Sequence, residues 1–275
     1  MRSNLILFFR SKDFTLVSFL VLAALVVRLL SLYYYQFIGV DGGIDGVGYA
    51  ISGKNLFSGL GYSVQGVPQV VLHPLYSILI GVSWFFTQNL EFSGQIVSVI
   101  AGSLLVIPVF YLTRGMYGRK AGLWTAIFIV ICPPLIFGST EVRLASLYTL
   151  VLSATIAIGW KAMGSKNLFW WAFTGLMLAL CYLTRSEGIM FLPIFLLLCL
   201  FLSKSKISYS SSTMKLIGLR GAILIVAFVL VSFPFWQFLH RHTGNWISTG
   251  RAAYTFMGYY GDSWEEANFD LVSNP

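Results

Sequence analysis

The chain has 275 residues, of which 57% are hydrophobic and 10% charged, and its formal net charge is +8. An average soluble domain has about 25% charged residues, so this composition excludes a soluble globular protein. Uncharged apolar runs of about 18 or more residues recur, and each is long enough for a helix to cross a hydrocarbon core of ~30 Å. The alternating segments of about 10 residues that mark a transmembrane barrel are missing from the sequence. We therefore expect an all-α polytopic membrane protein.

About seven apolar runs are long enough to be read as transmembrane helices. In chain order they cover Phe14–Ile38, Phe92–Thr113, Ala121–Gly138, Leu144–Trp160, Leu168–Leu183, Ile189–Leu202 and Leu216–Leu239. A further apolar helix at Pro74–Thr87 has only 14 residues, which predicts an interfacial or re-entrant segment after the first span.

The basic residues decide between the two possible topologies, because short cytoplasmic loops are enriched in Lys and Arg. With Pro74–Thr87 not crossing, one side holds Arg2, Arg10, Lys12, Arg114, Arg119, Lys120, Lys161, Lys166, Lys204, Lys206, Lys215 and Arg220. The other side keeps Lys54, Arg143, Arg185, Arg241 and Arg251. This predicts a cytoplasmic N-terminus in a plasma or inner membrane. Because the positive charge lies in these loops, it does not indicate nucleic-acid binding.

The chain divides into a transmembrane domain over residues 1–239 and a polar segment over 240–275. We expect the second part to be the start of an outer, non-cytoplasmic segment, and its abrupt end suggests a truncated chain. All acidic residues except Asp13 fall on the outer side in this topology.

The first outer loop is rich in glycine and carries Asp41, Asp45 and Tyr49, with Tyr62 shortly after. We expect Asp41, Tyr49 and Tyr62 to contact substrate. Glycines let a backbone turn tightly and approach a ligand closely. A carboxylate at the membrane boundary could act as a general base there. The alternative is a flexible polar turn with two solvated acids. The loop fits neither the helix-loop-helix calcium pattern nor a phosphate-loop signature.

Two further outer loops carry charged residues with possible roles in chemistry. Glu141 begins the turn between two spans, as a candidate catalytic group, a solvated cap or one half of a local pair with Arg143. Arg185 and Glu187 lie in a very short turn, where Arg185 could clamp a phosphate and Glu187 could orient it. The alternative is an ion pair that closes a tight hairpin.

Two residues near the outer face are harder to interpret. His73 begins the re-entrant helix and could contact substrate, although a lone interfacial histidine is more often structural. Arg28, near the outer end of the first span, is expected to snorkel to the interface or to pair with an outer carboxylate. No residue spacing supports a metal site, and the need for a cofactor stays open, a divalent ion included.

Taken together, these blocks resemble the membrane-embedded C-type (GT-C) glycosyltransferases that use polyprenyl-phosphate sugars. That group includes the protein mannosyltransferases, the lipid A aminoarabinose transferases and the RgtA/B/C/D-like proteins. The resemblance rests on Asp45-x-x-x-Tyr49-Ala50 leading to Gly59-x-Gly61-Tyr62, on His73-Pro74-Leu75-Tyr76, on Arg114 to Arg119, on Glu141, and on Leu183 to Gly188.

The resemblance implies a membrane enzyme that moves a sugar from a polyprenyl-phosphate donor to a hydroxyl of a lipid, glycan or protein on the non-cytoplasmic face. It implies Asp45 as the base, with Asp41 fitting that position less well, Glu141 as the second acidic residue, and Arg185 beside the lipid phosphate. It also implies a single inverting displacement and further helices beyond this chain.

Two other classes stay open from the sequence. A transporter or lipid flippase also has many helices with few ionisable groups, but it tends to place charges near the bilayer midplane. An inactive fragment of a transferase is the second alternative.

Overall fold

The structure is a computed structural model that describes residues 11–35, 43–165, 167–204 and 211–250. Its elements follow in the order α1 (Ser11–Tyr35), α2 (Gly43–Phe57), β1 (Ser63–Val64), β2 (Val67–Pro68), α3 (Pro74–Thr87), α4 (Leu90–Leu104), α5 (Val106–Tyr117), α6 (Arg119–Ile131), α7 (Pro133–Phe137), α8 (Leu144–Met163), α9 (Phe169–Thr184), η2 (Ser186–Met190), α10 (Phe191–Lys204) and α11 (Ser211–Thr243). The two short strands form an antiparallel hairpin. The protein is therefore helical, as the composition predicts.

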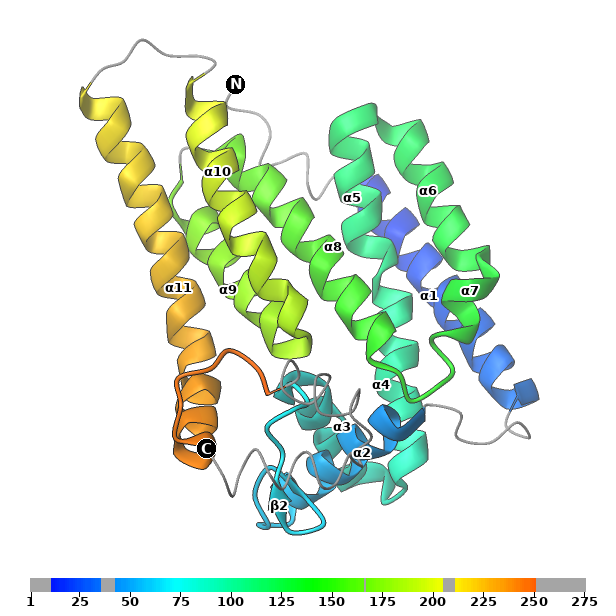
Figure 1. Ribbon diagram of the computed structural model, residues 1–275. Helices are drawn as coiled ribbons and strands as arrows, with labels where there is room; N and C mark the ends of the chain where they lie inside the picture. The colour runs from blue at the N-terminus through cyan, green and yellow to red at the C-terminus, as the bar shows by residue number, and fades with distance from the viewer. Residues whose placement is uncertain (1–10, 36–42, 166, 205–210, 251–275) are drawn as a thin grey trace.

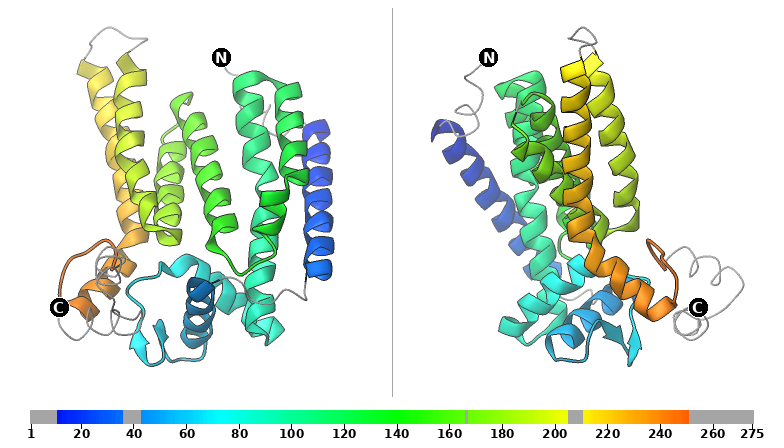
Figure 2. Two further views of the ribbon diagram at one scale, coloured as in Figure 1. Left: turned by 45° about the vertical axis from the view of Figure 1, so that its right-hand side comes forward. Right: turned by 90° about the vertical axis from the view of Figure 1, so that its left-hand side faces the viewer.

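The long helices run side by side as a bundle, and the smaller elements gather at one end of it (Figure 1). We call this the α2 end, because α2, α3 and the hairpin lie there, and the other the opposite end, where α5 turns into α6. Figure 2 shows the same separation from two further directions. The described segments that carry the other predicted functional residues lie at the α2 end.

Four helical stretches described in the structure are long and apolar enough to cross a membrane: Asp13–Tyr34, Leu90–Tyr117, Leu144–Met163 and Lys215–Thr243. The other three expected spans are also helical, but each is shorter or interrupted. The predicted span Ala121–Gly138 is divided into α6 and α7 at Cys132, because Pro133 and Pro134 have no backbone N–H to continue the helix. The polytopic helical class is confirmed, whereas the number of seven crossings stays a prediction.

Three apolar clusters hold the bundle together. One joins α9, α10 and α11, a second joins α1, α5 and α6, and a third joins α2, α3, α4 and α8. Close backbone approach contributes to the first, since a Cβ on Gly175 of α9 would lie 2.3 Å from the Leu224 carbonyl oxygen of α11. In a bilayer, van der Waals packing of this kind drives helix association.

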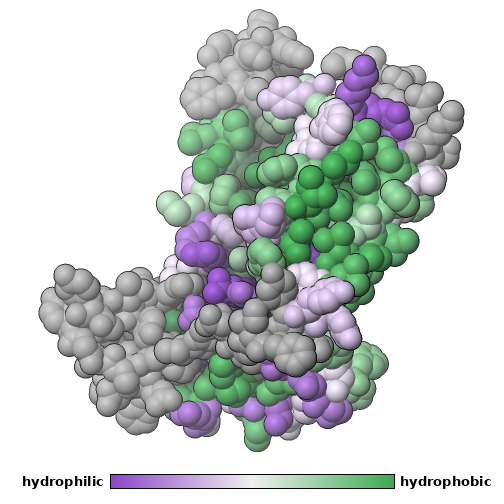
Figure 3. Space-filling model, turned by 90° about the vertical axis from the view of Figure 1, so that its right-hand side faces the viewer, coloured by the Kyte–Doolittle hydropathy of each residue, from purple (hydrophilic) through white to green (hydrophobic). Residues whose placement is uncertain are grey.

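The side of the molecule formed by α1 and α6 is broadly hydrophobic, with hydrophilic side chains toward its ends (Figure 3). The exposed apolar residues on these two helices include Phe19, Leu22, Leu30, Trp124 and Phe128. An apolar surface of this extent is expected to face lipid rather than water.

An ion-pair cluster lies near the opposite end. The carboxylate of Asp13 is buried, with one oxygen 2.9 Å from Nη1 of Arg114 and the other 2.7 Å from Nε of Arg119. These pairs tie the start of α1 to α5 and α6.

The glycine-rich segment after the first span differs from the sequence expectation. The sequence predicts that Asp45 and Tyr49 lie in a loop, but α2 already begins at Gly43 and contains Asp45 in its first turn. The physical reason is tertiary: Gly46 is buried against the loop before α8, and the helix buries Tyr49 and Ala50 in the third cluster. Packing therefore outweighs the low helix propensity of glycine.

Candidate functional site

Asp45 and Glu141 lie on segments that pack against each other. A Cβ placed on Gly46, the neighbour of Asp45, would be only 2.6 Å from the backbone oxygen of Val142, the neighbour of Glu141. The same turn packs on α4, where a Cβ on Gly94 would be 2.5 Å from a methyl group of Val142. The structure thus brings together two loops that are almost one hundred positions apart in the sequence.

The two carboxylates of this junction are both accessible. Asp45 is exposed in the first turn of α2. Glu141 is about one-third exposed, and its Oε2 lies 2.6 Å from Nε of Arg143, so the local pair considered from the sequence is present. The paired Oε2 atom is buried while the two side chains remain partly exposed, so the pair fixes the direction of Glu141.

The turn between α9 and η2 meets the same region through α8. The Nε of Arg185 donates to Oε1 of Glu187 at 2.9 Å, and the hydroxyl of Ser186 donates to Oε2 at 3.1 Å. The Arg185 guanidinium carbon lies 5.7 Å from the ring centre of Tyr148, on α8 shortly after the Glu141 turn. The third predicted loop therefore lies beside the first turns of α8.

The Glu187 carboxyl is held in its charged form. Burial acts to raise its pKa, but its own backbone N–H, then the Arg185 charge and the Ser186 hydroxyl, outweigh that effect and leave the pKa below its usual value. Arg185 keeps about 40% of its side chain exposed. A bound anion could therefore reach the guanidinium without breaking the hairpin.

Tyr49, Tyr62 and His73 are buried rather than open to the site. Tyr49 makes an edge contact with Tyr76 at 5.3 Å between ring centres, and the hydroxyl of Tyr62 donates to the Leu72 carbonyl at 2.8 Å. Burial raises the pKa of the Tyr62 hydroxyl well above its usual value, so this group acts as a donor.

The ring of His73 is enclosed by aromatic side chains, 5.1 Å from Tyr182 and 5.2 Å from Phe235 between ring centres. These contacts give His73, like Tyr49 and Tyr62, a packing role beneath the site. Contact of these three residues with substrate stays a prediction.

Asp41 lies outside the described residues. Among the described residues, no group of three or more His, Cys, Asp or Glu side chains is placed to hold a metal ion.

The expectation that Arg28 snorkels to the interface is wrong. Its side chain is fully buried, and its guanidinium donates from Nε to Ser139 Oγ, from Nη1 to the Ala24 carbonyl and from Nη2 to the Ile129 carbonyl, at 3.2 to 3.3 Å. None of the ion pairs between described residues includes it. The sequence shows an arginine inside an apolar run, which marks a possible site. It does not show the partners Ser139 and Ile129, because they lie on two distant segments.

The profile of the dolichyl-phosphate-mannose-protein mannosyltransferase family matches residues 71–232, which is more than half of the chain. The chain belongs to this family. The matched region includes His73, Glu141, Arg185 and Glu187, whereas Asp45 lies before it. No curated protein matches the sequence.

A solved structure confirms the fold. The crystal structure of the Archaeoglobus fulgidus oligosaccharyltransferase, a complex with Zn and sulfate, superposes with a TM-score of 0.67 at 14% identity. The match covers 93% of this chain and 38% of that one, so this chain spans well under half the length of its structural neighbour. The likeness assigns the GT-C fold to this family member.

Proposed function

We propose that this protein is a membrane glycosyltransferase that moves a sugar from a polyprenyl-phosphate donor to an acceptor hydroxyl at the α2 end, on the non-cytoplasmic face. The observation that carries the proposal is the packing of Gly46 on Val142, which puts Asp45 and Glu141 on adjoining segments. Membership of the mannosyltransferase family supports the reaction class. The segregation of basic residues toward the opposite end supports the orientation.

In the proposed reaction, Asp45 accepts the proton of the acceptor hydroxyl as the oxygen attacks the anomeric carbon. The new carbon–oxygen bond forms while the bond to the lipid phosphate breaks, and the bonding electrons leave with the phosphate. One displacement of this kind inverts the anomeric centre. Arg185 offsets the charge on the departing phosphate, and Glu141 positions the acceptor or donor.

The proposal includes a donor class and an acceptor class, which the family supports. A polyprenyl-phosphate sugar reaches the site through the bilayer, already activated, and the acceptor hydroxyl belongs to a lipid, a glycan or a protein. The apolar sides of the bundle beside the α2 end support a lipid donor.

The test is transfer of radiolabelled sugar from a panel of synthetic polyprenyl-phosphate donors in membranes that contain the chain. We expect Asp45→Ala to lower turnover by about 10²–10⁴-fold, the usual contribution of a general base, with unchanged expression and thermal unfolding. Glu91→Gln is the matched control, because Glu91 is an acid in the first turn of α4 outside the Asp45–Glu141 junction. Full transfer by Asp45→Ala contradicts the assignment of the base, and absence of transfer by the unaltered chain contradicts the proposed activity.

A further inference from the structure

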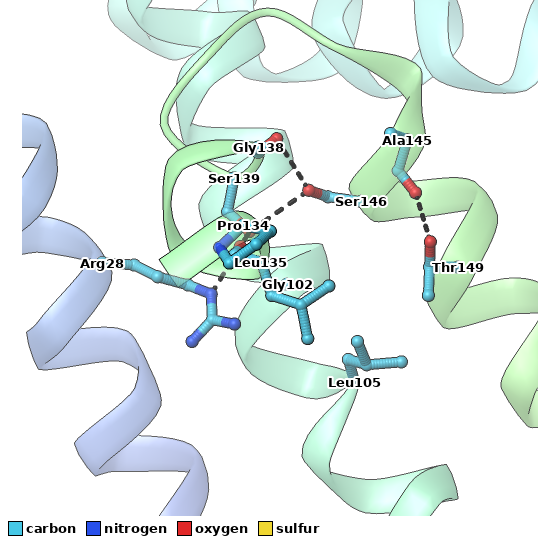
Figure 4. A pocket seen from close by; sticks show the side chains of 10 residues that line it. All are labelled: Arg28, Gly102, Leu105, Pro134, Leu135, Gly138, Ser139, Ala145, Ser146 and Thr149. Atoms are coloured by element: carbon cyan, nitrogen blue, oxygen red, sulfur yellow. Dashed lines mark hydrogen bonds between the residues drawn. The ribbon is translucent and has the colours of Figure 1, made fainter. Parts of the chain in front are cut away.

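Two arginines inside apolar helices, Arg28 of α1 and Arg220 of α11, take part in none of the ion pairs between described residues. Arg28 borders a cavity of about 60 Å³ between α1, α4, α7 and α8. Its side chain is fully buried, and all three of its nitrogens donate to protein oxygens, Ser139 Oγ among them (Figure 4). Arg28 is therefore closed to a ligand, whereas Arg220 is partly exposed.

Arg220 lies where α11 meets the turn between α8 and α9, at the opposite end of the bundle (Figure 1). Its Nη2 donates to the Ser165 carbonyl at 3.3 Å, and its guanidinium carbon lies 5.6 Å from the ring centre of Trp171. Its Nε has no hydrogen-bond partner among the described residues. The carbonyl and the indole ring attract the guanidinium, but neither carries the full negative charge that would neutralise it.

A second cation lies against the same turn of α9. Lys161 is in the last turn of α8, and its Nζ lies 3.8 Å from the ring centre of Trp170, the neighbour of Trp171. Lys161 is also partly exposed, so both cations can be reached from outside the protein. Two positive charges, each held against an indole ring, therefore flank the first turn of α9.

The surface beside these cations is aromatic. Phe169 is 59% exposed, lies 5.4 Å from Trp170 between ring centres, and stacks on Phe173 at 5.9 Å. Aromatic residues at the ends of membrane spans lie at the level of the lipid head groups. A pair of cations next to an exposed aromatic surface fits an amphiphile with a negative head group.

The opposite end as a whole is rich in positive charge. Among the described residues, Asp13 is the acid near this end, and its carboxylate is held by Arg114 and Arg119. The other described acids belong to α2, the start of α4, the turn before α8 and η2, toward the α2 end. Anionic lipids of the cytoplasmic leaflet attract Lys and Arg at a span end, and basic sites between helices bind their head groups.

We propose that Lys161 and Arg220, each backed by an indole of α9, bind the head group of an anionic phospholipid of the cytoplasmic leaflet. The phosphate lies between the two cations, and the acyl chains lie along the aromatic side chains at the start of α9. This lipid is a bound membrane lipid at the other end of the bundle from the proposed sugar donor. The choice of leaflet rests on the orientation proposed above, whereas the site rests on the contacts of the two cations.

The test is native mass spectrometry of the purified full chain in detergent, titrated with phosphatidylglycerol or with phosphatidylcholine. We expect the unaltered chain to bind its first phosphatidylglycerol more tightly than its first phosphatidylcholine. Arg220→Gln and Lys161→Gln should each weaken phosphatidylglycerol binding about fivefold, the effect of one cation near an anionic lipid surface. Arg220→Lys keeps the charge and should stay within about twofold, and thermal unfolding checks the fold of each variant.

Lys120→Gln is the matched control, because Lys120 is an exposed cation near the same end, on α6. It should bind phosphatidylglycerol as the unaltered chain does, and a loss equal to that of Arg220→Gln would overturn the location of the site. Equal affinity of the unaltered chain for the two lipids would overturn the site itself. Displacement of phosphatidylglycerol by millimolar inorganic phosphate would overturn a lipid ligand in favour of a free anion.

The measurement is independent of sugar transfer. Detergent-solubilised protein exposes both ends to added lipid, so binding does not depend on the orientation in a membrane. Asp45→Asn should lose sugar transfer and still prefer phosphatidylglycerol. Preference for this lipid in a chain that transfers no sugar would support the site and contradict the proposed function, whereas transfer without the preference would do the reverse.

Discussion

At the scale of single residues, glycine decides how closely the two acidic loops approach. Gly46 has no room for a side chain, because its missing Cβ would meet the Val142 backbone oxygen. A backbone oxygen cannot rotate away as a flexible side chain can. The position of Asp45 relative to Glu141 thus depends on a residue that carries no chemistry of its own.

Gly46→Ala should separate α2 from the turn before α8. We expect a loss of about 1–3 kcal/mol in stability, the usual effect of overpacking a well-filled contact, together with reduced sugar transfer. The measurements are thermal unfolding in nanodiscs and the transfer assay. Gly218→Ala, an exposed glycine of α11 with open space around its Cβ position, is the matched control. Equal behaviour of the two variants would show that the Gly46 contact is not tight.

The Arg185–Glu187 pair should give a pH-dependent contribution to stability. The folded-state pKa of Glu187 lies below its usual value, so the contribution is present above the usual glutamate range and is lost as pH falls through the lowered value. We expect the difference in unfolding temperature between the unaltered chain and Glu187→Gln to be constant near neutral pH and to shrink in acid. Because both side chains are substantially exposed, the difference is small. A difference in unfolding temperature that grows in acid would contradict a lowered pKa for Glu187.

At the scale of elements, a proline pair divides the apolar stretch Ala121–Gly138 into two helices, and an arginine hydrogen-bonds a carbonyl near the break. In a continuous helix the N–H of residue 133 would donate to the Ile129 carbonyl, but Pro133 has none. The Nη2 of Arg28 donates to that carbonyl instead, at 3.2 Å. An unsatisfied backbone carbonyl inside a bilayer is unfavourable, so the arginine stabilises the end of α6.

Arg28 and Pro133 both affect the hydrogen bonding of the Ile129 carbonyl, so substitutions at these two positions should be energetically coupled. Arg28→Met should destabilise the protein by about 1–3 kcal/mol, because it leaves the Ile129 carbonyl unsatisfied. In a Pro133→Ala background the same change should have a smaller effect, since the alanine N–H can serve that carbonyl. Thermal unfolding of the four proteins of this double-mutant cycle measures the coupling. If the effects of the two substitutions on the free energy of unfolding simply add, Arg28 and residue 133 do not share the Ile129 carbonyl.

At the scale of the whole molecule, charge separates along the bundle. Asp13 with Arg114 and Arg119 lies near the opposite end, whereas Asp45, Glu141 and the Arg185–Glu187 pair lie at the α2 end. Proteins sort basic loops to the cytoplasmic side of a membrane. The two ends of the bundle should therefore face different compartments.

Cysteine labelling in sealed inverted and right-side-out vesicles tests this orientation. In a background whose three cysteines are replaced by alanine, Gln88→Cys at the α2 end should react with an impermeant maleimide from the non-cytoplasmic side. Lys120→Cys, near the opposite end, should react from the cytoplasmic side. Both native positions are exposed, so access does not limit the reaction. Labelling of both from one side would contradict the topology.

Much of the fold could be predicted because the bilayer imposes a simple rule. Every backbone group inside hydrocarbon must be satisfied within its own segment, so apolar runs become helices whatever their tertiary partners. The class of the protein, the helical segments and the short Pro74–Thr87 helix follow from this rule. Pro133-Pro134 marks the break at Cys132 in the sequence, but the continuous apolarity of Ala121–Gly138 predicts one span, and the structure divides it.

The sequence by itself determined the polytopic helical class, the charged outer loops and the candidate residues within them. Only the tertiary structure decided which candidates meet: Gly46 packs on Val142, Arg185 lies over Tyr148, and Tyr49, Tyr62 and His73 are buried. It also decided that Arg28 binds the end of α6 and borders a cavity. The physical reason is that hydropathy and charge act locally along a chain, whereas close packing and buried polar contacts depend on residues that are far apart in the sequence.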